Sequence, residues 1–207
     1  RSALLMTQAV DSGIVQITKP VTKIVQLLEL DPLSEAKNIN ERLNRLPTLV
    51  RTLEMNELLS AVYFGYADGD FFLLRTVQHK AIKTNYGLSD DAAFLLQAID
   101  RNDSGEIEDT KWIVFDENIY QIDDITPKEY DYDPRVRPWF NNAMHSDTTI
   151  ITPPYIFFTT KEVGLTFAQQ NTKNHAIIGV DAALGDLSEV LKTLQPSKQS
   201  EIALMDD

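Results

Sequence analysis

Apolar residues recur every three or four positions through the first part of the chain, which is the period of an α-helix. The run covers residues 4–28, and Pro20 lies inside it. Because proline lacks a backbone N–H and its ring clashes with the preceding turn, we expect a kink or a break near Pro20. Asp31-Pro32 has the form of a cap followed by a first-turn proline, so a second helix is predicted from there to about Leu46.

Two runs rich in β-branched and aromatic residues follow, on either side of an Asp-Gly turn. They cover residues 61–66 and 71–76, an arrangement that is typical of a β-hairpin. Residues 92–100 fit either a short helix or a strand. We favour a strand, because a polar turn follows it and residues 111–122 have the composition of a returning strand.

The polar turn between these two runs has part of the spacing of an EF-hand calcium loop. Asp100, Asn102 and Ser104 stand where ligands are expected. Lys111 stands where the loop needs its bidentate glutamate, and a positive charge there replaces the strongest ligand. A hairpin loop without metal is therefore the favoured interpretation, and a calcium site is the alternative.

The second half of the chain combines a short helix, predicted to end near Met144, with several strands. Three β-rich runs follow the helix, at residues 149–158, 163–168 and 176–180. A helix over residues 184–194 and a last strand over residues 200–207 complete the pattern. Consecutive strands with short turns indicate an antiparallel sheet, and helices segregated from strands indicate an α+β fold.

Composition disfavours several classes of function. The chain has 207 residues, a net charge of −12 and no cysteine. The negative charge disfavours nucleic-acid binding and a polybasic membrane contact, and the lack of cysteine excludes disulfides, thiol catalysis and cysteine-based metal sites. The three histidines have no metal-ligand spacing, and no phosphate loop or Gly-x-Ser-x-Gly motif is present. We therefore expect no catalysis, cofactor or metal.

Residues 131–140 combine two arginines, two prolines and several aromatic residues, a mixture that an ordinary surface helix does not need. Asp133 can cap the turn that Pro134 begins. Arg137 then lies near a helix N-terminus, where free N–H groups and a guanidinium both favour a carboxylate or another anion. The tryptophan and the phenylalanine that follow supply apolar surface for a small-molecule pocket.

This stretch resembles the signature of the extracytoplasmic Cache sensor domains, most closely the distal PAS-like module of double-Cache domains in bacterial chemoreceptors, sensor histidine kinases and cyclases. The likeness extends to a Gly-Val-Asp segment at residues 179–181. It implies an α+β fold in which a long N-terminal helix packs on a PAS-like antiparallel sheet with short flanking helices. It also implies three parts: a helical stalk (1–58), the ligand-binding module (59–195), and a linker with the first strand of a second module (196–207).

The resemblance assigns the carboxylate of the ligand to a tyrosine, an arginine and a tryptophan of this stretch. Those residues match Tyr132, Arg137 and Trp139. The other arginine, Arg135, is interpreted as structural and paired with an acidic neighbour.

The resemblance assigns the amine of the ligand to a second group of residues. Tyr155 and Asp181 match this group, but Phe140 stands where a tyrosine is usual and Phe157 where an aspartate is usual. The two substitutions remove a hydroxyl and a counter-charge from a bound ammonium. An α-amino acid stays an open alternative, while a less polar carboxylate, or a methylated amine held by aromatic faces, fits the substitutions better.

A sensing function follows from the resemblance. We expect the small-molecule sensing domain of a membrane-anchored bacterial signal transducer, on the periplasmic or extracellular side of the membrane and without catalytic activity of its own. The output module would be a histidine kinase, a chemoreceptor signalling domain or a cyclase such as a diguanylate cyclase, and two copies would pair through the N-terminal helix. The alternative is a structural dimerisation module in which Arg137 and Trp139 stabilise a corner of the fold and no ligand binds.

Overall fold

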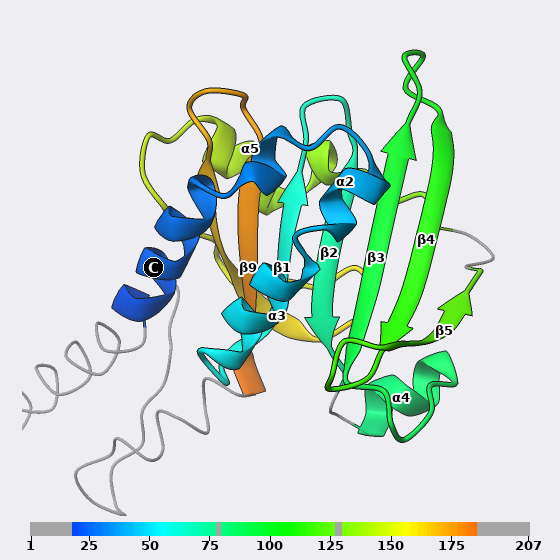
Figure 1. Cartoon of the computed structure of the whole chain (residues 1–207). Helices are drawn as coiled ribbons and strands as arrows, with labels where there is room; N and C mark the ends of the chain where they lie inside the picture. Colours follow the sequence, from blue (N-terminus) through cyan, green and yellow to red (C-terminus); the bar gives the residue numbers. More distant parts are fainter. Residues whose placement is uncertain (1–17, 78–79, 127–129, 186–207) are drawn as a thin grey trace, which may run out of the picture.

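A nine-stranded antiparallel sheet forms the centre of the molecule, with helices packed on both of its faces (Figure 1). The computed structural model describes residues 18–77, 80–126 and 130–185. Neighbouring strands follow the order β5-β4-β3-β2-β1-β9-β8-β6, and β7 pairs with β8 off this path. The predicted α+β class with an antiparallel sheet is confirmed.

The elements follow one another along the chain much as the sequence predicts. The strands are β1 (Leu59–Gly65), β2 (Phe71–Thr76), β3 (Phe94–Arg101), β4 (Ile107–Phe115), β5 (Gln121–Ile125), β6 (Ile150–Ile151), β7 (Tyr155–Ile156), β8 (Val163–Gln170) and β9 (Ile177–Ala183). Residues 18–29 are helical, and the other helices and 3-10 turns are η1 (Pro32–Glu35), α2 (Ile39–Leu43), α3 (Leu46–Glu54), α4 (Lys80–Tyr86), η2 (Pro134–Val136) and α5 (Pro138–Met144).

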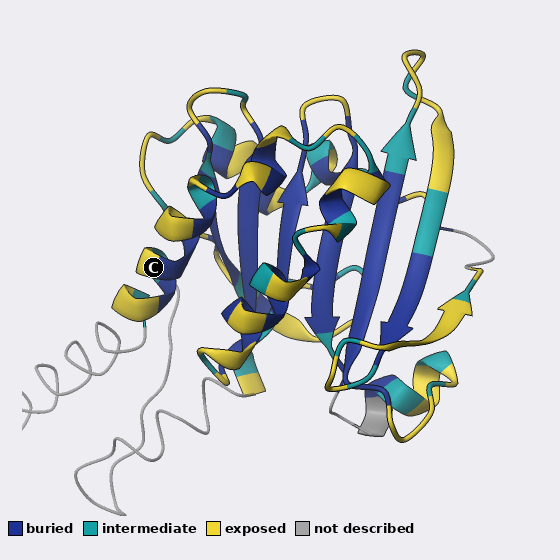
Figure 2. Ribbon diagram, in the orientation of Figure 1, coloured by how far each residue is buried: buried dark blue, intermediate teal, exposed yellow. Residues whose placement is uncertain are grey.

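The alternation of side chains along the strands divides the core into two layers. One layer lies between the sheet and the N-terminal helices, where Val21, Val25 and Leu28 pack with apolar residues of α2 and α3. The other layer lies on the opposite face, where residues of α5 pack on the sheet. The central strands are consequently buried on both faces, whereas β5 is exposed at the sheet edge (Figure 2).

The second predicted helix is divided, so the expectation of one helix from Asp31 to about Leu46 was wrong. The structure has the turn η1 and then the separate short helix α2. Asn38 explains the break, because its side chain accepts a hydrogen bond from the N–H of Glu41. The Glu41 carboxylate in turn accepts one from the N–H of Lys37 (2.8 Å), and these two bonds form a new N-terminal cap.

The single strand predicted over residues 111–122 is likewise two strands, β4 and β5. The Asp116 carboxylate accepts hydrogen bonds from the N–H groups of Asn118 and Tyr120 (2.9 and 2.8 Å). Ile119, in the same turn, has a φ of 65°. Such side-chain-capped turns reverse the chain, so β5 returns along β4 as the edge strand.

The polar turn after β3 is a hairpin loop, as the strands on either side of it predict. β4 begins at Ile107, and Lys111 pairs with Ala98 in the ladder between β3 and β4. Gly105 takes the left-handed conformation (φ 80°) that this tight turn requires. Within the described ranges, no group of three or more acidic or histidine side chains is placed to hold a metal ion.

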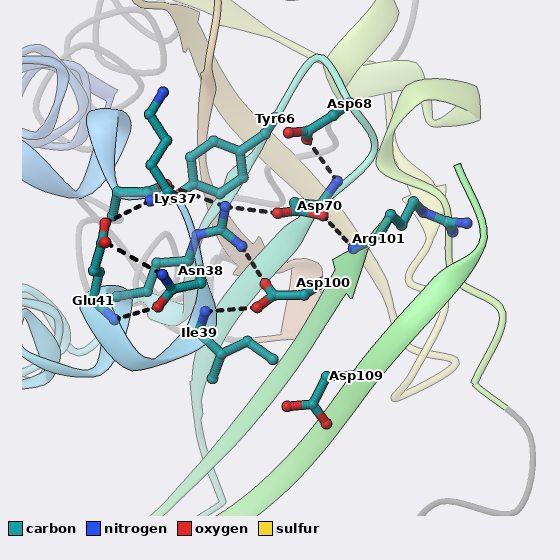
Figure 3. A network of polar contacts seen from close by, with 12 residues as sticks. Lys37, Asn38, Ile39, Glu41, Tyr66, Asp68, Asp70, Asp100, Arg101 and Asp109 are labelled. Atoms are coloured by element: carbon teal, nitrogen blue, oxygen red, sulfur yellow. Dashed lines mark hydrogen bonds and ion pairs between the residues drawn. The ribbon is translucent and has the colours of Figure 1, made fainter. Parts of the chain in front are cut away.

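A buried ionic network fastens α2 to the sheet (Figure 3). The Arg42 guanidinium donates to Asp70 (2.8 Å) and Asp100 (2.6 Å), and its Cζ lies 3.9 Å from the centre of the Tyr66 ring. Asp100 also accepts from the N–H of Ile39, the first residue of α2 (2.8 Å). The N-terminal helices are therefore tied to the sheet by charged side chains as well as by apolar packing.

Several expectations lie wholly or partly outside the described residues. The description begins at residue 18, and the helix is continuous over residues 18–29. The kink expected near Pro20 therefore falls at the border of what is described. Of the helix expected over 184–194, the first two residues are described and are helical, and the strand expected over 200–207 lies outside. None of the described helices combines the length and the apolar character needed to cross a bilayer.

Candidate functional site

A small cavity lies against the sheet face that carries α5. Twelve residues line it, and they come from the neighbouring strands β2, β1 and β9, from residues 130–137, and from β7 and the loop after it. Five of the seven residues that the sequence suggested for the site are among them: Tyr132, Arg137, Tyr155, Phe157 and Asp181. The fold thus brings together side chains that lie far apart in the sequence.

Strand register explains how charged residues meet in the floor of the cavity. Ala61 of β1 pairs with Arg75 of β2 on one side and with Asp181 of β9 on the other. The three residues form one row across the sheet and share a face, so the Cα atoms of Arg75 and Asp181 lie about 10 Å apart, twice the spacing of neighbouring strands. The small side chain of Ala61 leaves room between the two charged groups.

Asp181 is a buried carboxylate held by hydroxyl groups. The hydroxyls of Tyr63 and Thr166 each donate to its Oδ1 at 2.6 Å, and the Tyr155 hydroxyl lies 2.7 Å from that of Thr166. Burial raises the pKa of Asp181 to about 6, against the opposing effect of the two hydroxyl donors and of two nearby arginines. Its Oδ2 accepts no hydrogen bond from a described residue, so this oxygen is available to a donor on a ligand.

Arg137 presents an unpaired guanidinium to the cavity from the point where η2 ends and α5 begins. Its Nε is buried without a hydrogen-bond partner, and no ion pair of the described residues includes it. Its Cζ lies 5.7 Å from the centre of the Tyr132 ring and 5.6 Å from that of Phe158. These rings support the guanidinium and leave its N–H donors for an anion.

Trp139 and Phe140 lie behind the cavity wall. Trp139 is 1% exposed, and its indole N–H donates to the Tyr132 hydroxyl (3.2 Å). Phe140 packs edge-on against Trp139, so Trp139 supports Tyr132 directly and Phe140 supports Trp139. Arg135 does not line the cavity and pairs with Asp133 (2.8 Å), which confirms its predicted structural role.

The side chains of the wall nearly fill the cavity. They enclose about 320 Å³ of space without atoms, part of it open to solvent, and only about 20 Å³ is wide enough for the centre of a water molecule. Phe157 is buried, and its ring lies so close to Gly164 of β8 that a Cβ atom there would clash. A ligand of several heavy atoms must therefore displace part of the wall.

The residues that the sequence did not suggest include Arg75, Tyr130, Phe158 and Thr159. Arg75 had a signal of its own, since it is a charged residue inside the apolar run Phe-Phe-Leu-Leu-Arg. The other three lie outside the regular elements, and their approach to the cavity depends on the path of the loops.

The curated relatives of the chain are bacterial signalling proteins, although no known protein-family profile matches it. The chain is 27% identical over 153 residues to adenylate cyclase 1 of Rhizobium meliloti (strain 1021), which covers 73% of this chain and 23% of the cyclase. It is 32% identical over 63 residues to the methyl-accepting chemotaxis protein McpG of Pseudomonas putida, which covers 30% of this chain and 10% of that protein. The chain thus spans less than a quarter of these relatives.

Solved chemoreceptor domains share the arrangement of elements. The ligand-binding domain of the Campylobacter jejuni chemoreceptor Tlp3, in complex with L-norvaline, matches with a TM-score of 0.56 at 16% identity, over 92% of this chain and 62% of that one. The chain has a Cache sensor fold. The ligand-binding domain of the Pseudomonas fluorescens chemoreceptor CtaA, in complex with L-alanine, matches with a TM-score of 0.54 at 18% identity, over 93% of this chain and 63% of that one.

The Cache fold confirms the resemblance carried by residues 131–140 and 179–181. Both stretches contribute to the one cavity, through Arg137 from the first and Asp181 from the second. The cavity therefore offers an anion-binding guanidinium and, separately, a carboxylate oxygen that can accept from a donor or a cation. This arrangement suits a small molecule that carries both kinds of group.

Proposed function

We propose that this chain is the extracytoplasmic ligand-binding domain of a membrane-anchored bacterial signal transducer and that it binds a small molecule through a carboxylate. The observation that carries the proposal is the buried, unpaired Nε of Arg137 at the cavity. A buried donor without a partner costs about 1–3 kcal/mol. A bound carboxylate removes that cost and adds a two-pronged, charge-assisted hydrogen bond.

The opposite side of the cavity supports a hydrogen-bond donor or an ammonium group at the other end of the ligand. Oδ2 of Asp181 and the hydroxyl of Tyr155 are the acceptors there. The ligands named for the solved Tlp3 and CtaA domains are amino acids, which supports an amino acid or a close analogue for this chain. Phe157 adds apolar surface where a second carboxylate is usual in the resemblance, so methylated amines and small carboxylates belong among the candidates.

The wider setting is part of the same proposal. The named roles of the relatives support a cyclase or chemoreceptor output module and a place on the outer side of the cell membrane. Leu27 and Leu30, 65% and 76% exposed at the end of the N-terminal helix, support pairing with a second copy. We assign residues 1–58 to a stalk, 59–195 to the binding module, and 196–207 to the start of a second module.

A thermal-shift screen of amino acids, methylated amines, small carboxylates and polyols tests the proposal. A ligand at 100 times its Kd should stabilise the folded chain by about 2.7 kcal/mol, a shift of several degrees. Arg137→Gln should abolish the response to a carboxylate ligand. Arg135→Gln is the matched control, because Arg135 belongs to the same motif but pairs with Asp133 and does not line the cavity.

A negative screen would favour the second candidate, a structural dimerisation module without a ligand. The near-filled cavity is the observation that supports this candidate. In that case Arg137→Gln would change only the stability of the chain, and no compound would shift the unfolding temperature of either variant.

A further inference from the structure

Arg75 is a second cation in the cavity wall, and neither the carboxylate nor the amine end of the proposed ligand involves it. It is 4% exposed and lies on β2, across β1 from Asp181. Its Nε donates to the side-chain oxygen of Gln97 (2.9 Å), and Gln97 is itself fully buried. Within the described ranges, that is its one hydrogen bond, and no carboxylate forms an ion pair with it.

The other buried arginine of the described chain shows what such a charge ordinarily requires. Arg42 is 1% exposed and binds two carboxylates, those of Asp70 and Asp100. A guanidinium taken out of water without a partner is strongly destabilised, so buried charges in proteins are paired. Arg75 has the burial of Arg42 without its partners. Its terminal nitrogens are therefore placed to receive an anion that no described residue supplies.

Among the described residues, the charges around the cavity do not balance. Arg75 and Arg137 face a single carboxylate, Asp181, and the other titratable side chains of the wall are tyrosines. Burial raises the pKa of those tyrosines above its ordinary range, so they are neutral. An α-amino acid without a charged side chain carries no net charge and would leave the excess positive charge in place. A second carboxylate on the ligand supplies a negative charge that offsets the excess.

We infer that the cavity binds a small molecule with two carboxylate groups, one held by Arg137 and the other by Arg75. The inference rests on the proposed function, because it assigns the second end of the ligand at the same site. Gln97 fixes the Arg75 guanidinium through Nε and leaves Nη1 and Nη2, which together can bind a carboxylate in two-pronged fashion. The floor at Ala61 separates Arg75 from Asp181, so the second carboxylate lies to one side of the acceptor for an amine.

Two sources supply this chemistry, an acidic amino acid or a plain dicarboxylic acid, and two matched pairs of probes distinguish them. Binding calorimetry would compare L-glutamate with L-glutamine, and succinate with its monoamide. Each pair exchanges one carboxylate for an uncharged amide of similar size. At least one dicarboxylate should bind about tenfold to a hundredfold more tightly than its amide, the range expected for a hydrogen bond between charged groups.

Variants of Arg75 test whether this residue causes the preference for the dicarboxylate. Arg75→Gln should bring the Kd of the preferred dicarboxylate to that of its amide, and Arg75→Lys should keep part of the difference. Arg45→Gln is the control, since Arg45 pairs with Asp31 at the N-terminal helices and does not line the cavity. A purely structural Arg75 would lower the unfolding temperature in Arg75→Gln and leave the preference for the dicarboxylate unchanged, which would overturn the inference.

The comparison of dicarboxylates with their amides on the wild-type chain tests the inference even if a variant does not fold. The inference would be overturned if the amides bind as tightly as the dicarboxylates. It would also be overturned if the screen finds ligands with one carboxylate while neither dicarboxylate binds. Both outcomes would leave the proposed function intact. A screen in which no compound binds at all would remove the proposed function together with the inference. Binding of glutamate alone would identify an acidic amino acid, and binding of succinate alone a plain dicarboxylic acid.

Discussion

Asp181 makes the folded chain less stable when it ionises. Burial raises the pKa of this carboxyl to about 6, whereas in the unfolded chain it has the ordinary value of about 3.9. Below about pH 4 both states hold the proton. As the pH rises from about 4 to about 6, the unfolded chain releases its proton first, so the free energy of unfolding falls by on the order of 3 kcal/mol and stays low above that range. A buried carboxylate of this kind lowers the stability of the fold when it is ionised. Groups with shifted pKa values that reduce stability are common at binding sites.

Replacing this residue therefore should stabilise the protein. Asp181→Asn keeps an oxygen that accepts from Tyr63 and Thr166 and removes the buried charge. We expect the variant to exceed the wild type in free energy of unfolding at pH 8 and to lose about 1 kcal/mol of that advantage at pH 5. Urea unfolding at both pH values measures the difference. Asp147→Asn, at an exposed position, is the control, and an advantage of equal size at both pH values would contradict the role of ionisation.

At the scale of elements, local chemistry predicted most of the sheet. The first hairpin follows from two β-rich runs around an Asp-Gly turn, and β3 from the polar turn and the returning strand after it; the structure contains both. The two wrong boundaries have one cause. Asn38 begins α2 and Asp116 ends β4, each by accepting hydrogen bonds from backbone N–H groups two to four residues further on. The same residue types also occur inside helices and strands, so their presence alone does not mark the break.

The site was predictable as far as its residues match the family resemblance, both inside residues 131–140 and at Tyr155, Phe157 and Asp181. Arg137 was suggested by its neighbours in the chain, and Asp181 by the segment around it. Arg75 enters the site because Ala61 pairs with residues of both β2 and β9. That pairing is a long-range register between strands far apart in the sequence, and a single sequence contains no direct record of it.

The network around Arg42 should contribute much more to stability than an exposed ion pair does. Removing one partner of a buried pair leaves an uncompensated charge and costs about 3–5 kcal/mol. Arg42→Ala strands Asp70 and Asp100, so we expect a loss of that size in urea unfolding. Arg51→Ala is the matched control, because Arg51 pairs with Glu54 on the surface with its side chain 81% exposed, and it should change the free energy by about 1 kcal/mol or less. Equal losses would show that the network does not hold α2.

At the scale of the whole molecule, β8 joins the cavity to the N-terminal helix. Thr166 lies on the cavity face and donates to Asp181, whereas Gln169 lies on the other face and donates to the Glu29 carboxylate (2.7 Å). Asn171, just after β8, donates to the backbone carbonyl of Glu29 (2.7 Å). A ligand that displaces the hydroxyls around Asp181 acts on β8, and the same strand holds the end of the helix that would lead to the membrane.

We therefore expect a ligand found in the screen to slow hydrogen exchange of the amides in residues 18–29, and Gln169→Ala to reduce that protection. Coupling between two sites is reciprocal, so if the contact of Gln169 with the helix favours the bound state, Gln169→Ala should also weaken ligand binding. Gln170→Ala is the control, because Gln170 contacts Met144 of α5 and His175 instead of the N-terminal helix. Equal protection in both variants would mean that β8 does not carry the coupling. The charged network at α2 would then be the next connection to test, because it joins the N-terminal helices to β3 and to the turn before β2 without involving β8.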